Sequence, residues 1–152
     1  MVDLLKNLAD VARFMENEWI ASFATVDAES KPHVVPVWFT YEKDIVHVQT
    51  ARKSTKTRNL KQNSNVAVAV FKGEEAVLIQ GVGKIIADQG EFVRLTQCHI
   101  DKYNRLFNAA RGTKGVEYIK LDEQGRDNMG VPLFDSKVRC VIEVAPEKLR
   151  FW

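Results

Sequence analysis

The sequence contains few of the residues that build small disulfide-bonded or fibrous proteins. Its 152 residues include only two cysteines, Cys98 and Cys140, which are too few for a disulfide framework. The two do not form a CxxC pair, so we expect reduced thiols that pack in the core as small hydrophobic groups. Four prolines and eight glycines exclude a collagen-like or low-complexity chain.

Long apolar runs and an excess of charge of one sign are absent as well. The 22 Lys and Arg residues nearly balance the 20 Asp and Glu residues, which leaves a net charge of +2. No overall field therefore attracts nucleic acid or a membrane surface, and any basic site must be local. No stretch approaches the roughly 20 apolar residues of a membrane span, and the N-terminus lacks a signal-peptide cleavage site. We expect a cytoplasmic protein that contacts neither nucleic acid nor membrane.

The apolar content of 45% is ordinary for a globular protein, and the length predicts a single domain over residues 1–152. Hydrophobic periodicity predicts helices over residues 3–17, 54–63 and 89–110. It predicts strands over residues 19–26, 33–40, 45–49, 66–71, 76–87 and 137–144, and a last short strand over 149–152. Glycines interrupt residues 111–136, where only 116–121 suggest an ordered turn or strand.

Short turns join consecutive strands, and no βαβ alternation appears. The predicted fold class is therefore α+β: a small antiparallel β-barrel of about six strands with flanking helices, because barrel closure removes exposed edges. Pro36 cannot donate to a strand ladder, so we expect an edge, a bulge or an opening in the sheet there. Gly81 and Gly83 inside a strand predict a bulge or the close approach of another backbone or a ligand.

Residues 49–62 (QTARKSTKTRNLKQ) contain five cations and no acid. A strand is expected to end near Thr50 and a helix to begin near Thr55, where free N–H groups and hydroxyls beside Lys56 would suit a phosphate monoester. A solvated cationic helix is an equally open interpretation. A nucleic-acid patch is disfavoured because no aromatic residues interleave the cations. The glycines of a P-loop or a Rossmann fingerprint are missing.

The sequence predicts neither a metal site nor a catalytic dyad. His33, His47 and His99 lie on three different predicted elements without HxH or HxxxH spacing. Cys98 and His99 are adjacent on a predicted helix and therefore point in different directions. We name no catalytic side chain, and if the protein is an enzyme, a cofactor would carry the chemistry.

Four segments together resemble one known family. They are residues 33–39 (HVVPVWF), Gln49 with Thr50, residues 54–60 (STKTRNL) and residues 63–66 (NSNV). They are similar to the FMN-binding split-barrel family of pyridoxamine 5′-phosphate oxidase-like proteins. The resemblance implies a split β-barrel and a homodimer with FMN at the interface between the subunits.

The resemblance also implies site residues. Ser54, Thr55 and Lys56 match the phosphate-binding stretch, and Gln49 and Thr50 match the strand end beside the ribityl chain and the phosphate. The backbone of the strand that contains Val35, Pro36, Val37 and Trp38 matches the one that lies against the isoalloxazine ring. Trp38 is equally well interpreted as a core aromatic side chain at the rim of the barrel.

The chain also departs from the family's founding enzyme. It ends in KLRFW (residues 148–152) without that enzyme's Arg- and His-containing substrate motif, and Ala76 stands where a glutamine contacts flavin. It resembles instead the small relatives, which include flavin, nitro-compound and deazaflavin-dependent reductases. We expect an FMN-dependent oxidoreductase that passes electrons or hydride to a small organic acceptor. A non-catalytic flavin- or haem-binding protein and a deazaflavin-dependent reductase are the alternatives.

Overall fold

The computed structural model describes residues 7–151, which form three helices and one seven-stranded antiparallel sheet. The helices are α1 (Leu8–Asn17), α2 (Thr55–Gln62) and α3 (Gln89–Arg111). The strands are β1 (Ala21–Val26), β2 (Pro32–Val37), β3 (Thr40–Glu42), β4 (Ile45–Ala51), β5 (Asn65–Lys72), β6 (Glu75–Ile85) and β7 (Arg139–Phe151). The fold is an α+β split barrel, as expected.

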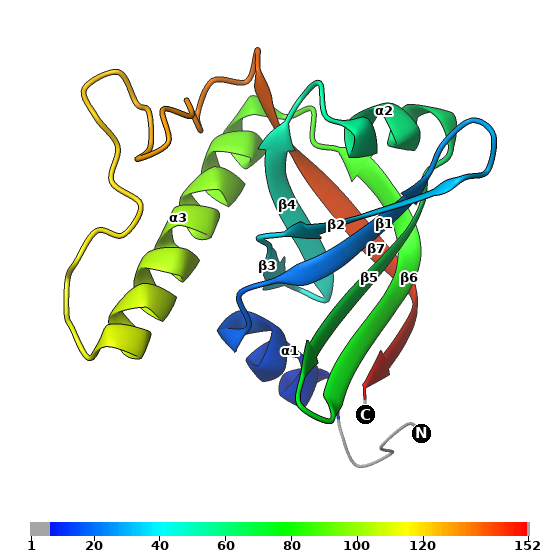
Figure 1. The fold of residues 1–152 in the computed structure, drawn as a ribbon, viewed down its shortest axis with the longest axis horizontal. Helices are drawn as coiled ribbons and strands as arrows, with labels where there is room; N and C mark the ends of the chain where they lie inside the picture. Colours follow the sequence, from blue (N-terminus) through cyan, green and yellow to red (C-terminus); the bar gives the residue numbers. More distant parts are fainter. Residues whose placement is uncertain (1–6, 152) are drawn as a thin grey trace.

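The split of the barrel follows from the order of the strands. β2 and β3 lie at opposite ends of the sheet, whose order is β2-β1-β5-β6-β7-β4-β3. Only Trp38 and Phe39 connect these two strands along the chain, so the sheet curls until its ends approach each other (Figure 1). Within residues 7–151, β2 pairs only with β1, which confirms that Pro36 lies on an edge strand.

Apolar side chains from all seven strands and from α1 fill the barrel. Those with no more than 2% exposure include Val11, Met15, Phe23, Phe39, Val48, Val68, Ile79 and Ile142. Each fully buried side chain of this kind stabilises the fold by about 1.5–3 kcal/mol. Although residues 66–71 are all apolar, the side chains of β5 alternate between buried and less buried positions, and that of Phe71 near its end is 63% exposed.

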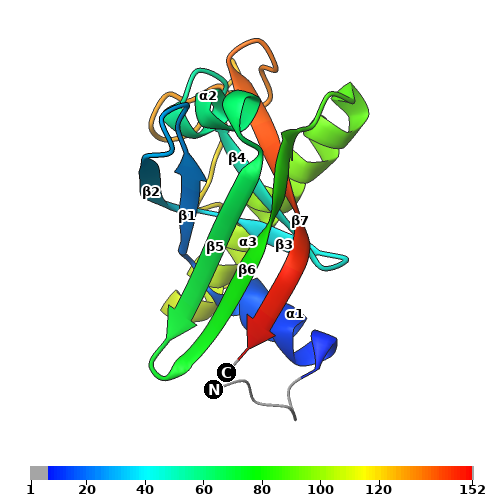
Figure 2. The same cartoon turned by 90° about the vertical axis from the view of Figure 1, so that its right-hand side faces the viewer.

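Helix α3 stands beside the barrel, and residues 112–138 return along it to β7 without forming a helix or strand (Figures 1 and 2). Asp88 caps α3 by accepting a hydrogen bond from the Glu91 N–H, as its spacing predicts. Gly112 ends the helix in the left-handed conformation that favours glycine. A second apolar cluster, which includes Tyr103 and Leu133, joins α3 to this returning segment.

Several boundaries differ from those that the sequence predicts. The short β3 was missed because only Phe39 and its neighbours separate it from β2. The two predicted C-terminal strands are one long strand, β7, which bends opposite a register shift between Gln80 and Gly81. A Cβ on Gly81 would collide with the carbonyl oxygen of Ala145, so the expected close backbone approach is confirmed. Residues 3–6 and 152, which we assigned to the first helix and the last strand, lie outside the described residues.

Candidate functional site

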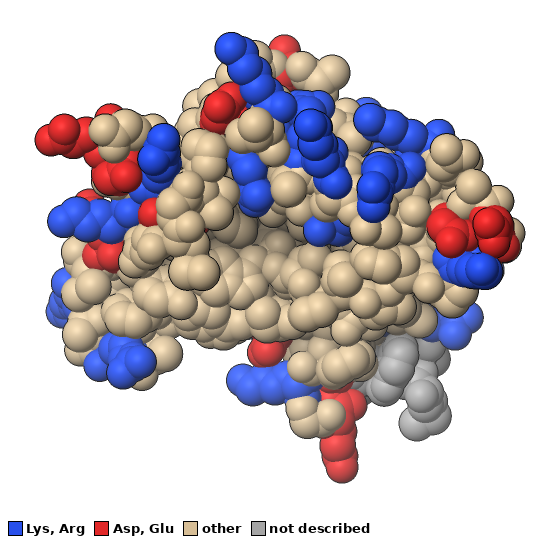
Figure 3. Space-filling model, turned by 45° about the horizontal axis from the view of Figure 1, so that its top comes forward, with Lys and Arg blue, Asp and Glu red and all other residues tan. Residues whose placement is uncertain are grey.

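Four cations gather where β4 ends, α2 begins and β7 begins. Arg52 follows β4, Lys56 lies in the first turn of α2, Lys61 lies in its last turn and Arg139 opens β7. Burial raises the pKa of the Cys140 thiol beneath them, and the charges of all four residues act on it in the opposite direction. We call these four residues the cation cluster. Figure 3 shows Lys and Arg side chains gathered over this part of the molecule.

The cation cluster has few carboxylates near it: Asp127 acts on Arg139, but from beyond salt-bridge distance. Among residues 7–151, none of its four side chains forms a salt bridge. Arg52 donates to the Ser136 carbonyl at 2.9 Å, and Arg139 donates to the Gln49 side-chain oxygen at 2.7 and 3.1 Å. Burial and the neighbouring Arg139 charge lower the pKa of Lys56. Because the cations repel one another, a bound anion would stabilise them.

The first turn of α2 brings Ser54, Thr55 and Lys56 together. The Ser54 hydroxyl accepts the Thr57 N–H at 3.4 Å and so caps the helix, while the Thr57 hydroxyl donates to the Ser54 carbonyl at 2.7 Å. The Thr55 hydroxyl accepts from Arg58 at 3.1 Å. Since the first N–H groups of a helix have no partner within it, the turn offers N–H donors beside the Lys56 ammonium.

A buried polar contact sets the position of α2. The Asn59 side chain donates to the Thr25 hydroxyl of β1 at 3.0 Å, and both residues are buried. Leu60 on the same face of the helix packs into the barrel core. These contacts hold the N-terminus of α2 at the mouth of the barrel. This structural role of the STKTRNL segment was not predicted from the sequence.

Gln49 and Thr50 lie near the end of β4, and both are buried. The Gln49 side chain donates to the Leu133 carbonyl at 2.6 Å and accepts from Arg139, so the chain itself satisfies this amide. Thr50 pairs with Cys140 of β7. Gln49 therefore orients Arg139, a contact that no local sequence pattern reveals because the two residues lie 90 positions apart.

The strand predicted to face the isoalloxazine ring is an open edge. Val35, Pro36 and Val37 pair only with β1, so the other side of their backbone has no strand partner. Trp38 follows the strand, and its indole ring stacks on Tyr103 of α3 with ring centroids 4.1 Å apart. The side chain of Trp38 is thus a packed aromatic of the barrel rim, whereas the backbone edge beside it remains available to a ligand.

Trp38 and Gln49, which belong to two separate predicted groups, line one cavity of about 350 Å³. Other lining residues, among them His99, Tyr118, Asp127 and Arg139, were not predicted as site residues. No local sequence pattern could indicate them, because they come from α3, β7 and the glycine-interrupted segment, which lie far from β2 and β4 along the chain. Since Arg139 belongs both to this cavity and to the cation cluster, the two features are continuous.

The histidines and cysteines do not converge. Among residues 7–151, no group of three His, Cys, Asp or Glu side chains lies close enough to hold a metal ion. His47 approaches Glu143 at 3.9 Å, and both Cys98 and Cys140 are free thiols. Cys140 is buried as expected, whereas Cys98 is partly exposed.

None of the helices in the described part of the chain has the length and apolar character to cross a bilayer.

A sequence model of the family described as pyridoxamine 5′-phosphate oxidase matches residues 8–128. The chain belongs to this family. No curated protein sequence is similar enough to the chain to count as a match.

Solved structures share the fold at low sequence identity. The chain matches the conserved hypothetical protein Rv2991 from Mycobacterium tuberculosis with a TM-score of 0.75 at 19% identity, covering 100% of this chain and 88% of that one. It matches the haem storage protein HutZ from Vibrio cholerae with a TM-score of 0.64 at 15% identity, covering 95% and 94%. An F420 reductase matches with a TM-score of 0.58 at 20% identity, covering 90% and 93%.

Proposed function

We propose that this family member binds FMN at the mouth of the barrel and acts as an oxidoreductase that passes electrons or hydride to a small organic acceptor. The observation that carries the proposal is the cation cluster, which has no carboxylate partner among the described residues and lies beside the first turn of α2. This arrangement would bind an anion, and a phosphate monoester supplies the matching charge and acceptor oxygens.

The residues present fit FMN in two respects. Lys56 and the free N–H groups of α2 would hold the phosphate, with Ser54 keeping the turn in shape. The unpaired edge at Val35, Pro36 and Val37 would present backbone donors and acceptors to the ring system. Gln49 and Thr50 lie near the end of β4, on the stretch of chain that leads to α2. Bound FMN would supply the hydride and electron chemistry, while these residues bind and orient it.

The proposal includes a homodimer. β2 lies at one end of the sheet, and the side chain of Val34 within it is 61% exposed. Cofactor sites usually enclose most of their ligand, so a second subunit would cover the ring. Sedimentation of the FMN-loaded protein should give a dimer, and a stable monomer that retains FMN would contradict this part of the proposal.

The deciding experiment identifies the cofactor and tests turnover. The purified protein is denatured, the released small molecules are identified by mass spectrometry, and the apoprotein is titrated with FMN, F420 and haemin. FMN should be released and should rebind, NADH or NADPH should reduce it, and a small acceptor should reoxidise it. Preferential binding of F420 or haemin would overturn the FMN assignment. Bound FMN that no donor reduces would identify a flavin-binding protein without turnover.

A further inference from the structure

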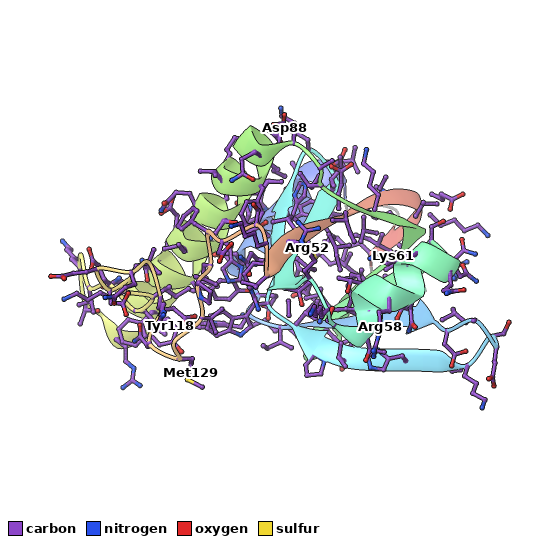
Figure 4. The ribbon with its side chains drawn as sticks, turned by 90° about the horizontal axis from the view of Figure 1, so that it is seen from above. Arg52, Arg58, Lys61, Asp88, Tyr118 and Met129 are labelled. Carbon is purple, nitrogen blue, oxygen red and sulfur yellow. The ribbon has the colours of Figure 1, made fainter. Side chains whose placement is uncertain are left out.

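The cavity of about 350 Å³ lies beside the cation cluster, between the end of β2, the middle of α3 and residues 118–133. Its size is within the range of small-molecule sites, which is roughly 300–1,000 Å³. Figure 4 shows Tyr118 and Met129 on the segment beside α3, well away from Arg58 and Lys61 on α2. No residue of α2 is among those that line the cavity, so a ligand confined to it would be bound by residues outside the first turn of α2.

His99 is the first sign that this cavity holds a ligand. Its side chain is 8% exposed and lines the cavity, and no hydrogen bond to its ring is formed within residues 7–151. Nδ1 is sealed from solvent, so Nε2 is the ring nitrogen left to face a ligand. Polar groups with little exposure are almost always paired, so Nε2 of a nearly buried imidazole at a cavity wall offers a hydrogen-bonding atom to a ligand. Burial together with the Lys102 and Arg139 charges lowers the pKa of His99 to about 4, so its ring is neutral at pH 7.

Arg139 provides a positive charge that is already oriented. Its Nε and Nη2 atoms donate to the Gln49 side-chain oxygen at 3.1 and 2.7 Å, and Gln49 in turn donates to the Leu133 carbonyl at 2.6 Å. This chain of contacts fixes the plane of the guanidinium and leaves its remaining N–H donors for a ligand. A planar guanidinium fork matches the geometry of a carboxylate.

The walls of the cavity are aromatic. The ring of Trp38 lies 6.0 Å from that of His99 and 6.0 Å from that of Tyr118, with the planes tilted by 38° and 35°. Rings at this separation pack against one another, so the three side chains form one aromatic wall against which a flat ring can lie. Asp127 also lines the cavity, but one of its carboxylate oxygens accepts the Met129 and Val131 N–H groups at 2.9 Å, which ties its charge to the covering turn.

We propose that this cavity binds a small planar aromatic carboxylate. Arg139 would bind the carboxylate, Trp38 and Tyr118 would contact the ring, and His99 would form one further hydrogen bond. Binding of the carboxylate is inferred only from the geometry of the cavity. That the bound carboxylate is the electron acceptor of the flavin rests on the proposed function.

The first test compares three probes on the purified protein by calorimetry and by quenching of tryptophan fluorescence. They are 2-naphthoate, its uncharged carboxamide and its saturated decahydro analogue. We expect 2-naphthoate to bind at least tenfold more tightly than either of the other two. Equal affinity for the naphthoate and the amide would overturn the role of Arg139. Equal affinity for the flat and saturated acids would overturn the aromatic slot.

The second test uses matched variants. Arg139→Met should weaken naphthoate binding at least tenfold and leave amide binding unchanged, whereas Arg150→Met, which is exposed on the same strand, should change neither. His99→Phe should weaken naphthoate binding severalfold and leave FMN binding unchanged. An unchanged naphthoate affinity in Arg139→Met or His99→Phe, with folding verified by circular dichroism, would overturn the site.

The third test separates the cavity from the flavin site. Lys56→Ala should weaken FMN binding and leave naphthoate binding unchanged. Displacement of naphthoate by riboflavin would overturn the proposal, because the cavity would then belong to the flavin ring. If FMN fails to bind while naphthoate follows the expected pattern, the flavin function fails and the carboxylate site stands.

Discussion

The indole ring of Trp38 stacks on the phenol ring of Tyr103, with centroids 4.1 Å apart and planes only 12° from parallel. The Tyr103 hydroxyl donates to the Trp19 carbonyl at 2.7 Å and accepts the Phe39 N–H at 2.8 Å. The stack therefore joins α3 to the two residues that link β2 and β3, where the ends of the curled sheet approach each other.

Removing the Tyr103 hydroxyl should destabilise the protein more than the loss of a single oxygen atom suggests. Tyr103→Phe would leave the buried Phe39 N–H without its side-chain partner, and an unsatisfied buried group costs about 1–3 kcal/mol. Urea denaturation measures the loss of unfolding free energy. Tyr118→Phe is the control, because no hydrogen bond is seen for that hydroxyl, and a similar loss in both variants would contradict the prediction.

Trp38→Ala should lower stability by about 3 kcal/mol, the lower end of the range for truncating a packed tryptophan. The folded fraction should nevertheless retain FMN, because the backbone edge of β2 and not the indole would face the ring. Thermal denaturation and flavin stoichiometry are measured on the same sample. Loss of flavin without loss of stability would show that the indole itself contacts the cofactor.

Acid should destabilise the protein through His99. Its pKa is lowered from 6.5 to about 4 in the folded protein, first by burial and then by the Lys102 and Arg139 charges, with Asp127 acting in the opposite direction. Between these pH values the unfolded chain binds a proton that the native protein does not, so stability falls as the pH is lowered from 6.5 to 4. The contribution amounts to at most about 3 kcal/mol.

The unfolding free energy of the wild type and of His99→Gln is measured at pH 7 and at pH 4.5. The variant should lose less stability over this interval than the wild type. His47, whose pKa burial also lowers, is present in both proteins and cancels in the comparison. Equal losses in the two proteins would show that His99 does not titrate in this way.

Lys56→Ala should weaken FMN binding about tenfold to a hundredfold, because a hydrogen bond to a charged group contributes about 1.5–3 kcal/mol. Binding of riboflavin, which lacks the phosphate, should change little. Lys53→Ala is the control: it lies exposed in the same turn and removes the same charge from outside the cation cluster. Equal effects of the two variants, or equal effects on FMN and riboflavin, would indicate a solvated cationic face.

Gly81→Ala should destabilise the sheet by about 1–3 kcal/mol, the usual range for overpacking. The new Cβ would meet the Ala145 carbonyl and Pro146, which are backbone atoms that cannot rotate away. Gly90→Ala is the control, since its Cβ would meet only the Asp88 side chain at 3.2 Å. Thermal denaturation compares the two variants, and a loss for Gly81→Ala no greater than for Gly90→Ala would contradict this prediction.

Local patterns in the sequence determined much of the barrel. Alternating and β-branched residues located β1, β4, β5 and β6 to within about two residues, and Asp88 located the start of α3. Pro36 marked an edge strand and Gly81 a close backbone contact, because each residue type restricts its own backbone surroundings. The start of α2 and its cations were likewise visible, since helix caps depend on neighbours within one turn.

Only the tertiary structure decided what completes the site. Arg139 joins Lys56 across more than 80 positions, and Gln49 contacts Leu133 across 84. The segment that we could not interpret, residues 111–136, provides the cover of the cavity and brings Tyr118 and Asp127 to His99. Periodicity and capping report contacts within a few residues along the chain. Pairings such as these exist only after the sheet has curled and α3 has packed beside it.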